Sequence, residues 1–284
     1  MTSNVHPSAK IHPSAIVEPG AVIGEGSEIG PFSIIGPRAV LGKGNHVASH
    51  VVIEGRTTFG DENRVYQFAS IGAAPQDLKF KGEESQLIVG NGNMIREYVT
   101  LQPGTAGGDM KSVIGDKNLF MAGSHVAHDT VVGNGNVLAN YACLAGHVVV
   151  GNRCTLGGLV GIHQFVRIGD MSILAAGSMV AQDIPPFCMG QGDRCSLIGL
   201  NRIGLQRNGA SPEDISRLRK LYRLLFWGGG RLSARIDEAS REIEGFELGE
   251  RLVGFLKAPS KRGVVGARMG RAKGESGEGA SSEV

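Results

Sequence analysis

Six residues in the middle of the chain are of the types that acyl transfer requires. They are four histidines, a glycine and a glutamine: His125, His128, Gly146, His147, His163 and Gln164. Histidine is the natural general base near neutral pH, and an exposed glycine N–H can stabilise an oxyanion. Transfer of an acyl group to a hydroxyl needs both functions. The alternative is that these histidines only decorate a surface.

An interval of eighteen residues relates several of these positions. His128, Gly146 and Gln164 follow one another at that interval, and Asp129 precedes His147 by the same distance. If one turn of the chain contains eighteen residues, each set stacks on successive turns about 5 Å apart. A base, a glycine and an amide would then line one wall of a groove.

A six-residue repeat supplies that turn. From Val5, eleven consecutive hexads begin with Val, Ile, Leu or Phe and have a compact residue at position five. The phase resumes at Val89 and again at Ile114, from where it continues to Pro185. Positions five and one point to the same side of an extended chain and fill a narrow interior, while Gly, Asn and Pro between them form turns. Three hexads close one coil, which predicts an all-β solenoid over residues 1–190.

Two segments interrupt the repeat, near 73–86 and near 107–113. In a solenoid such insertions loop out of one face, often the binding face, although tolerated surface loops are the alternative. The four histidines avoid hexad positions one and five, so none of them should point into the core. We therefore expect them on the outside of the solenoid or at one of its corners.

The pattern changes after residue 186. Ser211 followed by Pro212 is typical of the start of a helix, and the apolar residues that follow recur at helical spacing. The expected elements are a small α-helical C-terminal domain over 191–258, with later helices near 232–244 and 247–257, and a disordered tail over 259–284. The tail is expected to be disordered because it is rich in Gly, Ser, Lys and Glu.

Composition limits the class of protein. Glycine accounts for 44 of 284 residues and aromatic residues for 5%, a balance that suits a repetitive solenoid better than a layered globule. The N-terminus lacks the features of a signal peptide, and no apolar run approaches the ~18 residues of a membrane span. The four cysteines form neither a CxxC pair nor a set with zinc spacing. We therefore expect a reduced, cytoplasmic protein without integral membrane association.

Positive charge is concentrated near the C-terminus. Residues 202–273 contain sixteen Lys and Arg against eight Asp and Glu. Such a region can bind nucleic acid, a membrane surface or an acidic protein. The basic face of the first long helix, from Arg217 to Arg223, has no interleaved aromatic residues for stacking on bases. We expect an acidic protein partner and no nucleic acid, with an ordinary solvated helix face as the alternative.

Several motifs together resemble those of a known family of enzymes. They are PQDLKFKGE in the first insertion, HVAHDTVVGNGNVLANYACLAGHVVVG around the central histidines, and then GIHQF and AQDIPPF. The chain resembles the UDP-N-acetylglucosamine O-acyltransferases of lipid A biosynthesis over about residues 5–257. This resemblance implies a left-handed parallel β-helix that assembles as a homotrimer, with active sites in the clefts between neighbouring subunits.

The resemblance also implies an activity. An (R)-3-hydroxyacyl chain passes from acyl carrier protein to the 3-position of UDP-N-acetylglucosamine, the first step towards the lipid A of lipopolysaccharide, without a metal or other cofactor. By resemblance, His128 is the base that activates the sugar hydroxyl, Gly146 offers its N–H to the oxyanion, and Ala176 limits the acyl length. The residues implied to contact the sugar nucleotide or the acyl chain are Asp77, Lys79, His125, His147, His163, Gln164, Asn201 and Arg207.

The chain departs from the family near the sugar. Where relatives often have Ile-His-Arg-Gly-Thr, residues 101–105 are Leu-Gln-Pro-Gly-Thr, so a 3-amino analogue of the sugar stays open as the acceptor. Ile203 stands where some relatives have glutamate, which affects the expected ribose contacts. Three other functions stay open as well: a coenzyme-A-dependent acetyl- or succinyltransferase with hexapeptide repeats, a zinc enzyme of the γ-carbonic anhydrase type, and a non-catalytic scaffold.

Overall fold

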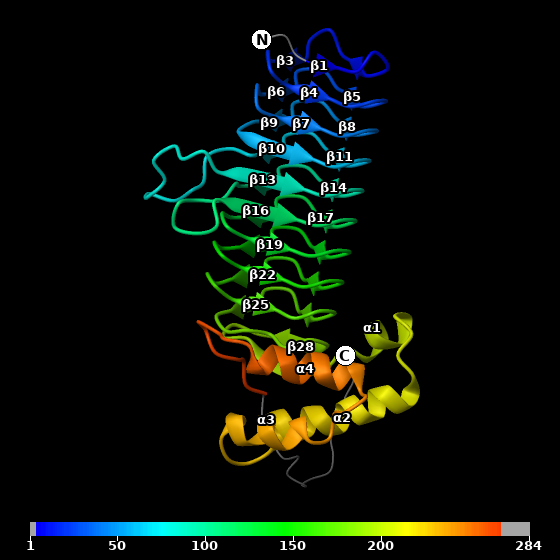
Figure 1. Cartoon of the computed structure of the whole chain (residues 1–284), viewed down its shortest axis with the longest axis vertical. Helices are drawn as coiled ribbons and strands as arrows, with labels where there is room; N and C mark the ends of the chain where they lie inside the picture. The colour runs from blue at the N-terminus through cyan, green and yellow to red at the C-terminus, as the bar shows by residue number, and fades with distance from the viewer. Residues whose placement is uncertain (1–3, 268–284) are drawn as a thin grey trace, which may run out of the picture.

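The chain winds into a long column of coils that ends against a group of helices (Figure 1). This computed structural model describes residues 4–267. Short parallel strands form three flat faces, and each coil passes from sheet 1 to sheet 2 and then to sheet 3. The column is the parallel β-helix that the hexapeptide repeat predicts.

The strands are assigned to the three sheets as follows. Sheet 1 contains β1 (Asn4–Val5), β4 (Val22–Ile23), β7 (Val40–Leu41), β10 (Arg56–Phe59), β13 (Gln86–Val89), β16 (Lys111–Ile114), β19 (Val131–Val132), β22 (Val149–Val150) and β25 (Arg167–Ile168). Sheet 2 contains β2 (Lys10–Ile11), β5 (Glu28–Ile29), β8 (His46–Val47), β11 (Arg64–Val65), β14 (Met94–Ile95), β17 (Leu119–Phe120), β20 (Val137–Leu138), β23 (Thr155–Leu156), β26 (Ile173–Leu174), β28 (Cys188–Gln191) and β29 (Ser196–Leu200). Sheet 3 contains β3 (Ile16–Val17), β6 (Ile34–Ile35), β9 (Val52–Ile53), β12 (Ser70–Ile71), β15 (Thr100–Leu101), β18 (His125–Val126), β21 (Cys143–Leu144), β24 (Gly161–Ile162) and β27 (Met179–Val180).

The first residue of each hexad forms the core. From Ile23 to Val180 these aliphatic and phenylalanine side chains are no more than 3% exposed, because every coil is covered above and below by another. Val5, Ile11 and Val17 of the first coil are only half-buried, since that coil has a neighbour on one side alone. Burial of a continuous apolar column is the main force that holds the coils together.

A column of asparagines runs inside the solenoid at hexad position five. Its members are Asn45, Asn63, Asn93, Asn118 and Asn136, all at most 2% exposed. The Nδ2 of Asn63 donates to Oδ1 of Asn45 at 3.0 Å, and the same amide contact recurs from Asn93 to Asn63 and from Asn118 to Asn93. Buried amides need such partners, and a matching amide one coil away supplies one to Asn63, Asn93 and Asn118. The Nδ2 of Asn136 has none within residues 4–267.

Both interruptions of the repeat leave from one corner of the solenoid. We call the turn from a strand of sheet 3 to the next strand of sheet 1 the 3–1 corner. Residues 72–85 join β12 to β13 there, and residues 102–110 join β15 to β16. These are the two loops that project to one side in Figure 1, and they follow the predicted insertions near 73–86 and 107–113. The insertions therefore mark one corner out of three.

The segment after the coils is mixed rather than purely helical. β28 extends sheet 2 across the expected boundary at residue 190, and β29 pairs with it in antiparallel fashion. The helices are α1 (Arg202–Arg207), α2 (Pro212–Trp227), α3 (Leu232–Ser240) and α4 (Glu247–Lys257). Ser211 caps α2, as predicted, because its Oγ accepts the N–H of Asp214 at 3.0 Å. Arg251 on α4 pairs with Asp170 and fastens the helices to the last coils.

A short segment returns from α4 to the solenoid. We call residues 259–267 the C-terminal strap; its Val265 is only 3% exposed. The N–H of Asp183 donates to the carbonyl of Gly263, and the N–H of Val265 donates back to Asp183. The composition predicts a disordered tail from 259, whereas these nine residues pack on the last coils because main-chain hydrogen bonds and Val265 hold them there. The rest of that expected tail, 268–284, lies outside the described residues.

Within residues 4–267, none of the helices has the length and apolar character needed to cross a membrane.

Candidate active site

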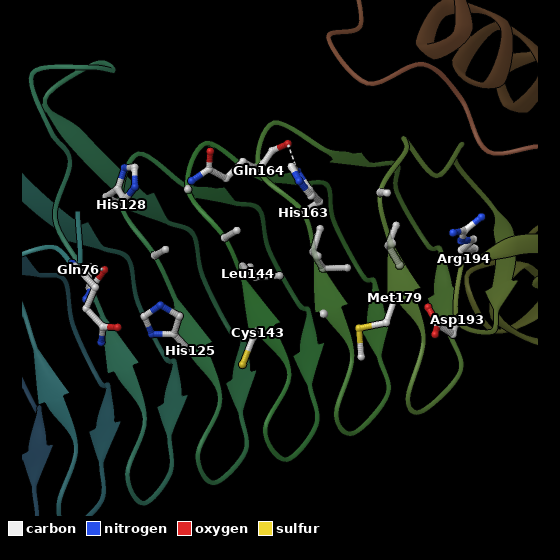
Figure 2. Close-up of a pocket in the computed structure, with 18 residues that line it drawn as sticks. Gln76, His125, His128, Cys143, Leu144, His163, Gln164, Met179, Asp193 and Arg194 are labelled. Atoms are coloured by element: carbon white, nitrogen blue, oxygen red, sulfur yellow. Dashed lines mark hydrogen bonds between the residues drawn. The ribbon is translucent and has the colours of Figure 1, made fainter. Parts of the chain in front are cut away.

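The 3–1 corner stacks the predicted base, glycine and amide on three successive coils. β18 pairs with β21 and β21 with β24 in parallel register, and His128, Gly146 and Gln164 each lie two residues beyond one of these strands. Figure 2 shows His128 and Gln164 along the same row of turns. The eighteen-residue interval therefore predicted this arrangement.

Gly146 lies directly against the His128 imidazole. A β-carbon on Gly146 would come within 2.5 Å of Cε1 and 2.6 Å of Nε2 of that ring, so no other residue fits without moving the histidine. Within residues 4–267, the N–H of Gly146 donates no hydrogen bond. That N–H is therefore available to an oxyanion beside the ring.

His128 is oriented by its neighbour along the chain. Its Nδ1 lies 2.8 Å from Oδ2 of Asp129, and both residues are buried. The N–H of Thr105 donates to Oδ1 of Asp129 at 3.0 Å, and the Thr105 hydroxyl donates to Oδ2 at 2.6 Å. Donation from Nδ1–H to the carboxylate gives the tautomer in which Nε2 is an acceptor. A His128 in that form is ready to take a proton at Nε2.

A left-handed turn makes this contact between adjacent residues possible. Asp129 has φ of 56°, a conformation that aspartate tolerates better than most residues. The turn is closed by the next coil, where the N–H of His147 donates to the carbonyl of His128 at 3.0 Å. The backbone of the second insertion approaches too, because a β-carbon on Gly108 would collide with the Asp129 carboxylate. The corner and its insertion therefore build the pair together.

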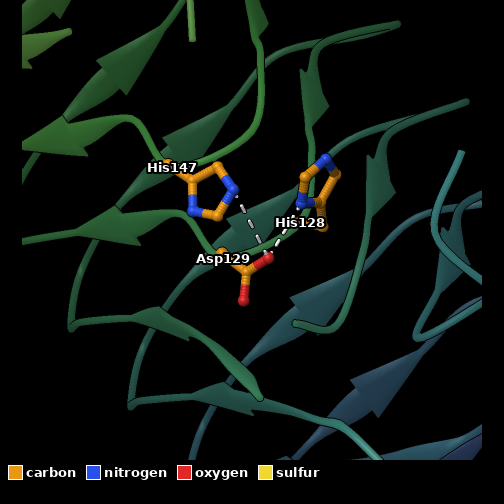
Figure 3. Close-up of side chains that lie close together, drawn as sticks. All are labelled: His128, Asp129 and His147. Atoms are coloured by element: carbon orange, nitrogen blue, oxygen red, sulfur yellow. Dashed lines mark hydrogen bonds and ion pairs between the residues drawn. The ribbon is translucent and has the colours of Figure 1, made fainter. Parts of the chain in front are cut away.

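His147 stands above Asp129, as the eighteen-residue interval predicts. Its Nε2 lies 4.0 Å from Oδ2 of Asp129, and its ring meets His128 edge-on at a centroid distance of 5.2 Å (Figure 3). The ring of Phe165 stacks on its other side at 4.4 Å and 9°. Burial lowers the pKa of His147, and the negative charge of Asp129 opposes that shift.

The outer face of sheet 3 forms a side wall of the site. His125, Cys143, Gly161 and Met179 occupy equivalent positions on β18, β21, β24 and β27. The Thr100 hydroxyl lies 2.6 Å from Nδ1 of His125, whose pKa is lowered by burial and then by the charge of His128. A β-carbon on Gly161 would lie 2.9 Å from Sδ of Met179. The Met179 side chain therefore lies across Gly161 and narrows the space beside this wall.

A cleft of about 590 Å³ runs along this wall from the 3–1 corner. Gln76 lies at one end, and Asp193 and Arg194 lie at the other (Figure 2). Gln102 also lines the cleft, and its Oε1 accepts the N–H of Gln76. The middle is largely apolar and includes Ile162, Met179 and Val180. An extended apolar chain with a polar group beside the histidines suits such a cleft.

Two predicted residues of the first insertion stand at the edge of this region. Asp77 and Lys79 do not line the cleft, although the adjacent Gln76 does. Lys79 is exposed, and its N–H donates to the Asp77 carboxylate at 3.0 Å. His163 and Gln164, by contrast, line the cleft with His125 and His128.

Three predicted residues lie away from the cleft of this chain. Asn201 is the N-cap of α1 and is 6% exposed; its Nδ2 donates to the carbonyl of Met171 and its Oδ1 accepts the N–H of Gly204. Arg207 is exposed in the last turn of α1. Ala176 follows β26 at the turn from sheet 2 to sheet 3, which we call the 2–3 corner, and it is exposed.

Sequence reasoning missed several members of the site. The partnership of Asp129 with His128 was not anticipated, although the interval had placed Asp129 under His147. The six-residue phase from Val89 places Thr105 at an inward position five, before the insertion expected near 107–113. In the structure Thr105 lies in the loop over 102–110 and holds that carboxylate instead. Gln102 is 3% exposed and its Oε1 accepts the N–H of Gln76. The departure from the family at residues 101–105 therefore falls on the cleft itself.

Three side chains of the corner also have the composition of a metal site. His128, Asp129 and His147 each offer a ligand atom, and these atoms lie within 4.8 Å of one another. Imidazole and carboxylate are ligands that zinc accepts. The Asp129 oxygen nearest to both rings already accepts hydrogen bonds from His128 and from the Thr105 hydroxyl, which fits a hydrogen-bonded pair without an ion.

Hexapeptide coils, a histidine base, a free glycine N–H and an apolar cleft define an acyltransferase of the hexapeptide-repeat class. A family model described as bacterial transferase hexapeptide (six repeats) matches residues 2–37, 20–55 and 111–146, and one described as UDP-N-acetylglucosamine O-acyltransferase, domain 2, matches residues 183–265. The chain belongs to the family of UDP-N-acetylglucosamine O-acyltransferases that are named for their acyl carrier protein donor.

Individual relatives support this assignment. The enzyme of that name from Myxococcus xanthus is 47% identical over 211 residues, which is 74% of this chain and 81% of the relative. The one from Paracoccus denitrificans is 50% identical over 201 residues, 71% of this chain and 76% of the relative. The solved UDP-N-acetylglucosamine acyltransferase from Campylobacter jejuni is 36% identical and covers 91% of this chain and 100% of its own, with a TM-score of 0.84. The predicted left-handed parallel β-helix with C-terminal helices is the fold of this family.

Proposed function

We propose that this enzyme transfers an (R)-3-hydroxyacyl chain from acyl carrier protein to the 3-position of UDP-N-acetylglucosamine, the first step of lipid A biosynthesis. The observation that carries the proposal is the His128 imidazole, held by Asp129 at 2.8 Å and pressed against Gly146 at the head of an apolar cleft. The names of the relatives supply the donor and the acceptor. The 3-amino analogue of the sugar is the second candidate acceptor, because Gln102 departs from the family within the cleft.

His128 and the main-chain N–H of Gly146 can supply every proton transfer and hydrogen bond that the proposed reaction needs. Nε2 of His128 takes the proton of the acceptor hydroxyl as its oxygen attacks the thioester carbonyl. The N–H of Gly146 donates to the oxyanion of the tetrahedral intermediate. The carbon–sulfur bond then breaks, and the proton passes from His128 to the leaving thiolate. An amine acceptor would follow the same route with one N–H proton.

Substrate contacts are proposed for the residues that line the cleft. His125, His163 and Gln164 line the cleft and would contact the sugar or the acyl chain beside the base. His147 does not line the cleft, so its proposed contact depends on its place next to His128 and Asp129. Asp77, Lys79, Asn201 and Arg207 lie outside the cleft of a single chain, so their proposed contacts with the nucleotide or acyl chain depend on a neighbouring copy or on movement of the first insertion.

A homotrimer is part of the proposal. A column of exposed rings at the 2–3 corner supports it: Phe32, His50, Phe68 and Tyr98 stack at centroid distances of 5.1 to 5.3 Å. Phe32 is 60%, Phe68 48% and Tyr98 61% exposed, and large apolar patches of this kind favour protein contacts. Replacing Phe68 with Glu should turn trimers into monomers in light scattering. A trimer that survives this change would mean that another face makes the contact.

Acyl carrier protein is proposed to dock on the exposed basic side of α2. Arg219, Lys220 and Arg223 are exposed there, whereas Arg217 is half-buried over the ring of Phe246. Reversal of Arg219 and Arg223 to Glu should raise KM for the carrier-bound donor and weaken its salt dependence. Unchanged kinetics at every salt concentration would identify an ordinary solvated face. A cytoplasmic location accompanies this donor in the proposal.

The test of the function is a reconstituted reaction. Purified enzyme is mixed with 3-hydroxyacyl carrier protein, or with the matching coenzyme A thioester, and with either candidate acceptor; mass spectrometry identifies the product. We expect acylated sugar nucleotide from the carrier-bound donor and a loss of about 10²–10⁴-fold in kcat for His128→Ala. Product from coenzyme A alone, or full activity of the variant, would overturn the proposal.

A further inference from the structure

The left-handed residues at three successive 3–1 turns form a column of their own. Asp129, His147 and Phe165 have φ of 56°, 61° and 66° and are spaced by one coil. Each therefore projects in the same direction as the one below. Asp129 lies beneath the His147 ring, and Phe165 stacks on the other side of that ring. This column of side chains runs from Asp129, which contacts His128, towards the C-terminal end of the solenoid.

The fourth member of the column comes from the other end of the chain. Nζ of Lys261, in the C-terminal strap, lies 4.2 Å from the centroid of the Phe165 ring. His147 already stacks at 4.4 Å on that ring, so the ammonium group must cover the opposite face. Within residues 4–267, Lys261 forms no ion pair with a carboxylate. Its charge is therefore directed at the ring, an arrangement that aromatic quadrupoles favour.

The strap holds Lys261 in place independently of that contact. The next residue, Arg262, donates from Nε to the carbonyl of Ala181 at 3.0 Å, and Ala181 lines the cleft. Further along, the N–H of Leu197 donates to the carbonyl of Gly266 at 2.9 Å. An exposed lysine side chain is usually free to move, but this one projects from a backbone that is anchored to the solenoid from the next residue onward.

The position of His147 depends on this stack. The separation of 4.0 Å between Nε2 of His147 and Asp129 is too long for a hydrogen bond, so Asp129 alone does not fix the ring. The His147 ring lies between Asp129 and Phe165. Its tilt is therefore set by the face of the Phe165 ring on which it stacks. Because His147 meets His128 edge-on at 5.2 Å, a tilt of one ring displaces the other.

We propose that Lys261 is a positioning residue of the active site. By covering the outer face of Phe165, Lys261 holds the ring that stacks on His147, and the edge-on contact of His147 with His128 passes the effect to the base. The inference rests on the proposed function, because its effect is read out in acyl transfer. It assigns the C-terminal strap to the catalytic machinery, although the strap carries no group that reacts.

The experiment compares Lys261→Ala with two companions in the full-length chain. Lys261→Ala should lower kcat by about 2- to 30-fold, the factor that the usual free energy of a cation–π contact is worth, with a smaller change in the donor KM. Lys261→Arg should restore kcat, since a guanidinium also lies over aromatic faces. The matched control is Lys117→Ala, an exposed lysine at the turn from sheet 1 to sheet 2 with φ of 56°, which should keep the wild-type kcat.

A second readout separates positioning from folding. Stacking on Phe165 should shift the His147 ring protons upfield in the NMR spectrum, and this shift should shrink in Lys261→Ala and vanish in Phe165→Leu. A lower melting temperature with wild-type kcat and unchanged His147 signals would overturn the inference. If wild-type enzyme made no acylated sugar nucleotide, the proposed function would fail instead, while the NMR comparison would still test the position of His147.

Discussion

His128 and His147 approach the same oxygen of Asp129, at 2.8 Å from Nδ1 of the first and 4.0 Å from Nε2 of the second. The two imidazoles come from consecutive coils, so one carboxylate links the proposed general base to a residue of the neighbouring coil. The negative charge of that carboxylate opposes the lowering of the His147 pKa by burial. His128, Asp129 and His147 therefore form one cluster, in which a change to the carboxylate affects both imidazoles.

Replacement of Asp129 with Asn tests this unit. The amide removes the negative charge that stabilises a protonated His128 during proton transfer, and it allows the wrong tautomer of that ring. We expect kcat to fall by about 10²-fold or more, with little change in acceptor binding measured by calorimetry. Asp116→Asn is the control, because that residue occupies a hydrogen-bonded column on a different corner. Wild-type kcat in Asp129→Asn would show that the carboxylate is not needed.

Replacement of Gly146 with Ala tests the close approach to His128. The new methyl group would occupy the space of the imidazole, which must move away from the acceptor, and kcat should drop about 10²–10³-fold. Gly158→Ala is a suitable control, because its β-carbon would meet only the carbonyl of Asn140 at 3.4 Å. Equal activity of both variants would remove Gly146 from the proposed mechanism.

Two half-buried histidines, His125 and His147, should make the stability of the fold depend on pH. Burial lowers the pKa of His125 and of His147 below the ordinary value of 6.5. The unfolded chain therefore binds more protons than the folded chain as the pH falls below 6.5, and the free energy of unfolding decreases in that range. His125→Gln combined with His147→Gln should flatten this decrease in urea titrations between pH 7 and 5. If the free energy of unfolding of the double variant falls with pH as steeply as that of the parent, other groups cause the decrease.

Removal of metal distinguishes the hydrogen-bonded pair from a zinc site. We expect dialysis against a chelator to leave acyl transfer unchanged and elemental analysis to find no stoichiometric zinc. About one zinc per chain, with activity lost on chelation and regained on addition of the ion, would instead make His128, Asp129 and His147 ligands. Sugar acylation and carbonic anhydrase activity should be measured on the same samples.

Acyl length tests the expected role of Ala176. If this residue limits the chain, Ala176→Met should favour shorter donors and Ala176→Gly longer ones, because pockets discriminate one methylene by about 10- to 200-fold. Ala176 lies at the 2–3 corner and not in the cleft of its own chain, so this role requires a neighbouring copy. Donors of graded length in competition measure the preference. If both variants keep the parent distribution, Met179, which lines the cleft, is the next residue to replace.

The repeat made most of the solenoid predictable from sequence. Positions five and one both point inward by the geometry of an extended chain, so Ile23 and Asn45 could be assigned to the core without coordinates. The same arithmetic placed Gly146 against His128 and His147 above Asp129. Regular coils convert sequence separation directly into distance, which few folds do.

Contacts that do not follow from the coil period could not be predicted from the sequence. The pairing of His128 with Asp129 requires a left-handed turn between neighbours, and nothing in the residue types distinguishes it from an ordinary turn. The family resemblance places residues 101–105 near the sugar, but Thr105 and Gln102 lie in a loop over 102–110 that leaves the repeat earlier than expected, so the period does not give their contacts. Lys261 lies in a segment whose composition predicts disorder, and main-chain hydrogen bonds to the last coils together with the burial of Val265 order it.

The C-terminal strap sets an order of events during synthesis of the protein. Coils stack on their immediate neighbours, so the solenoid can wind from its N-terminal end as the ribosome releases the chain. His128, Asp129 and Gly146 can then meet while the helices are still being made. The outer face of Phe165 is covered only when Lys261 emerges, so a nascent chain would have the proposed catalytic groups but lack the lysine that we propose steadies them.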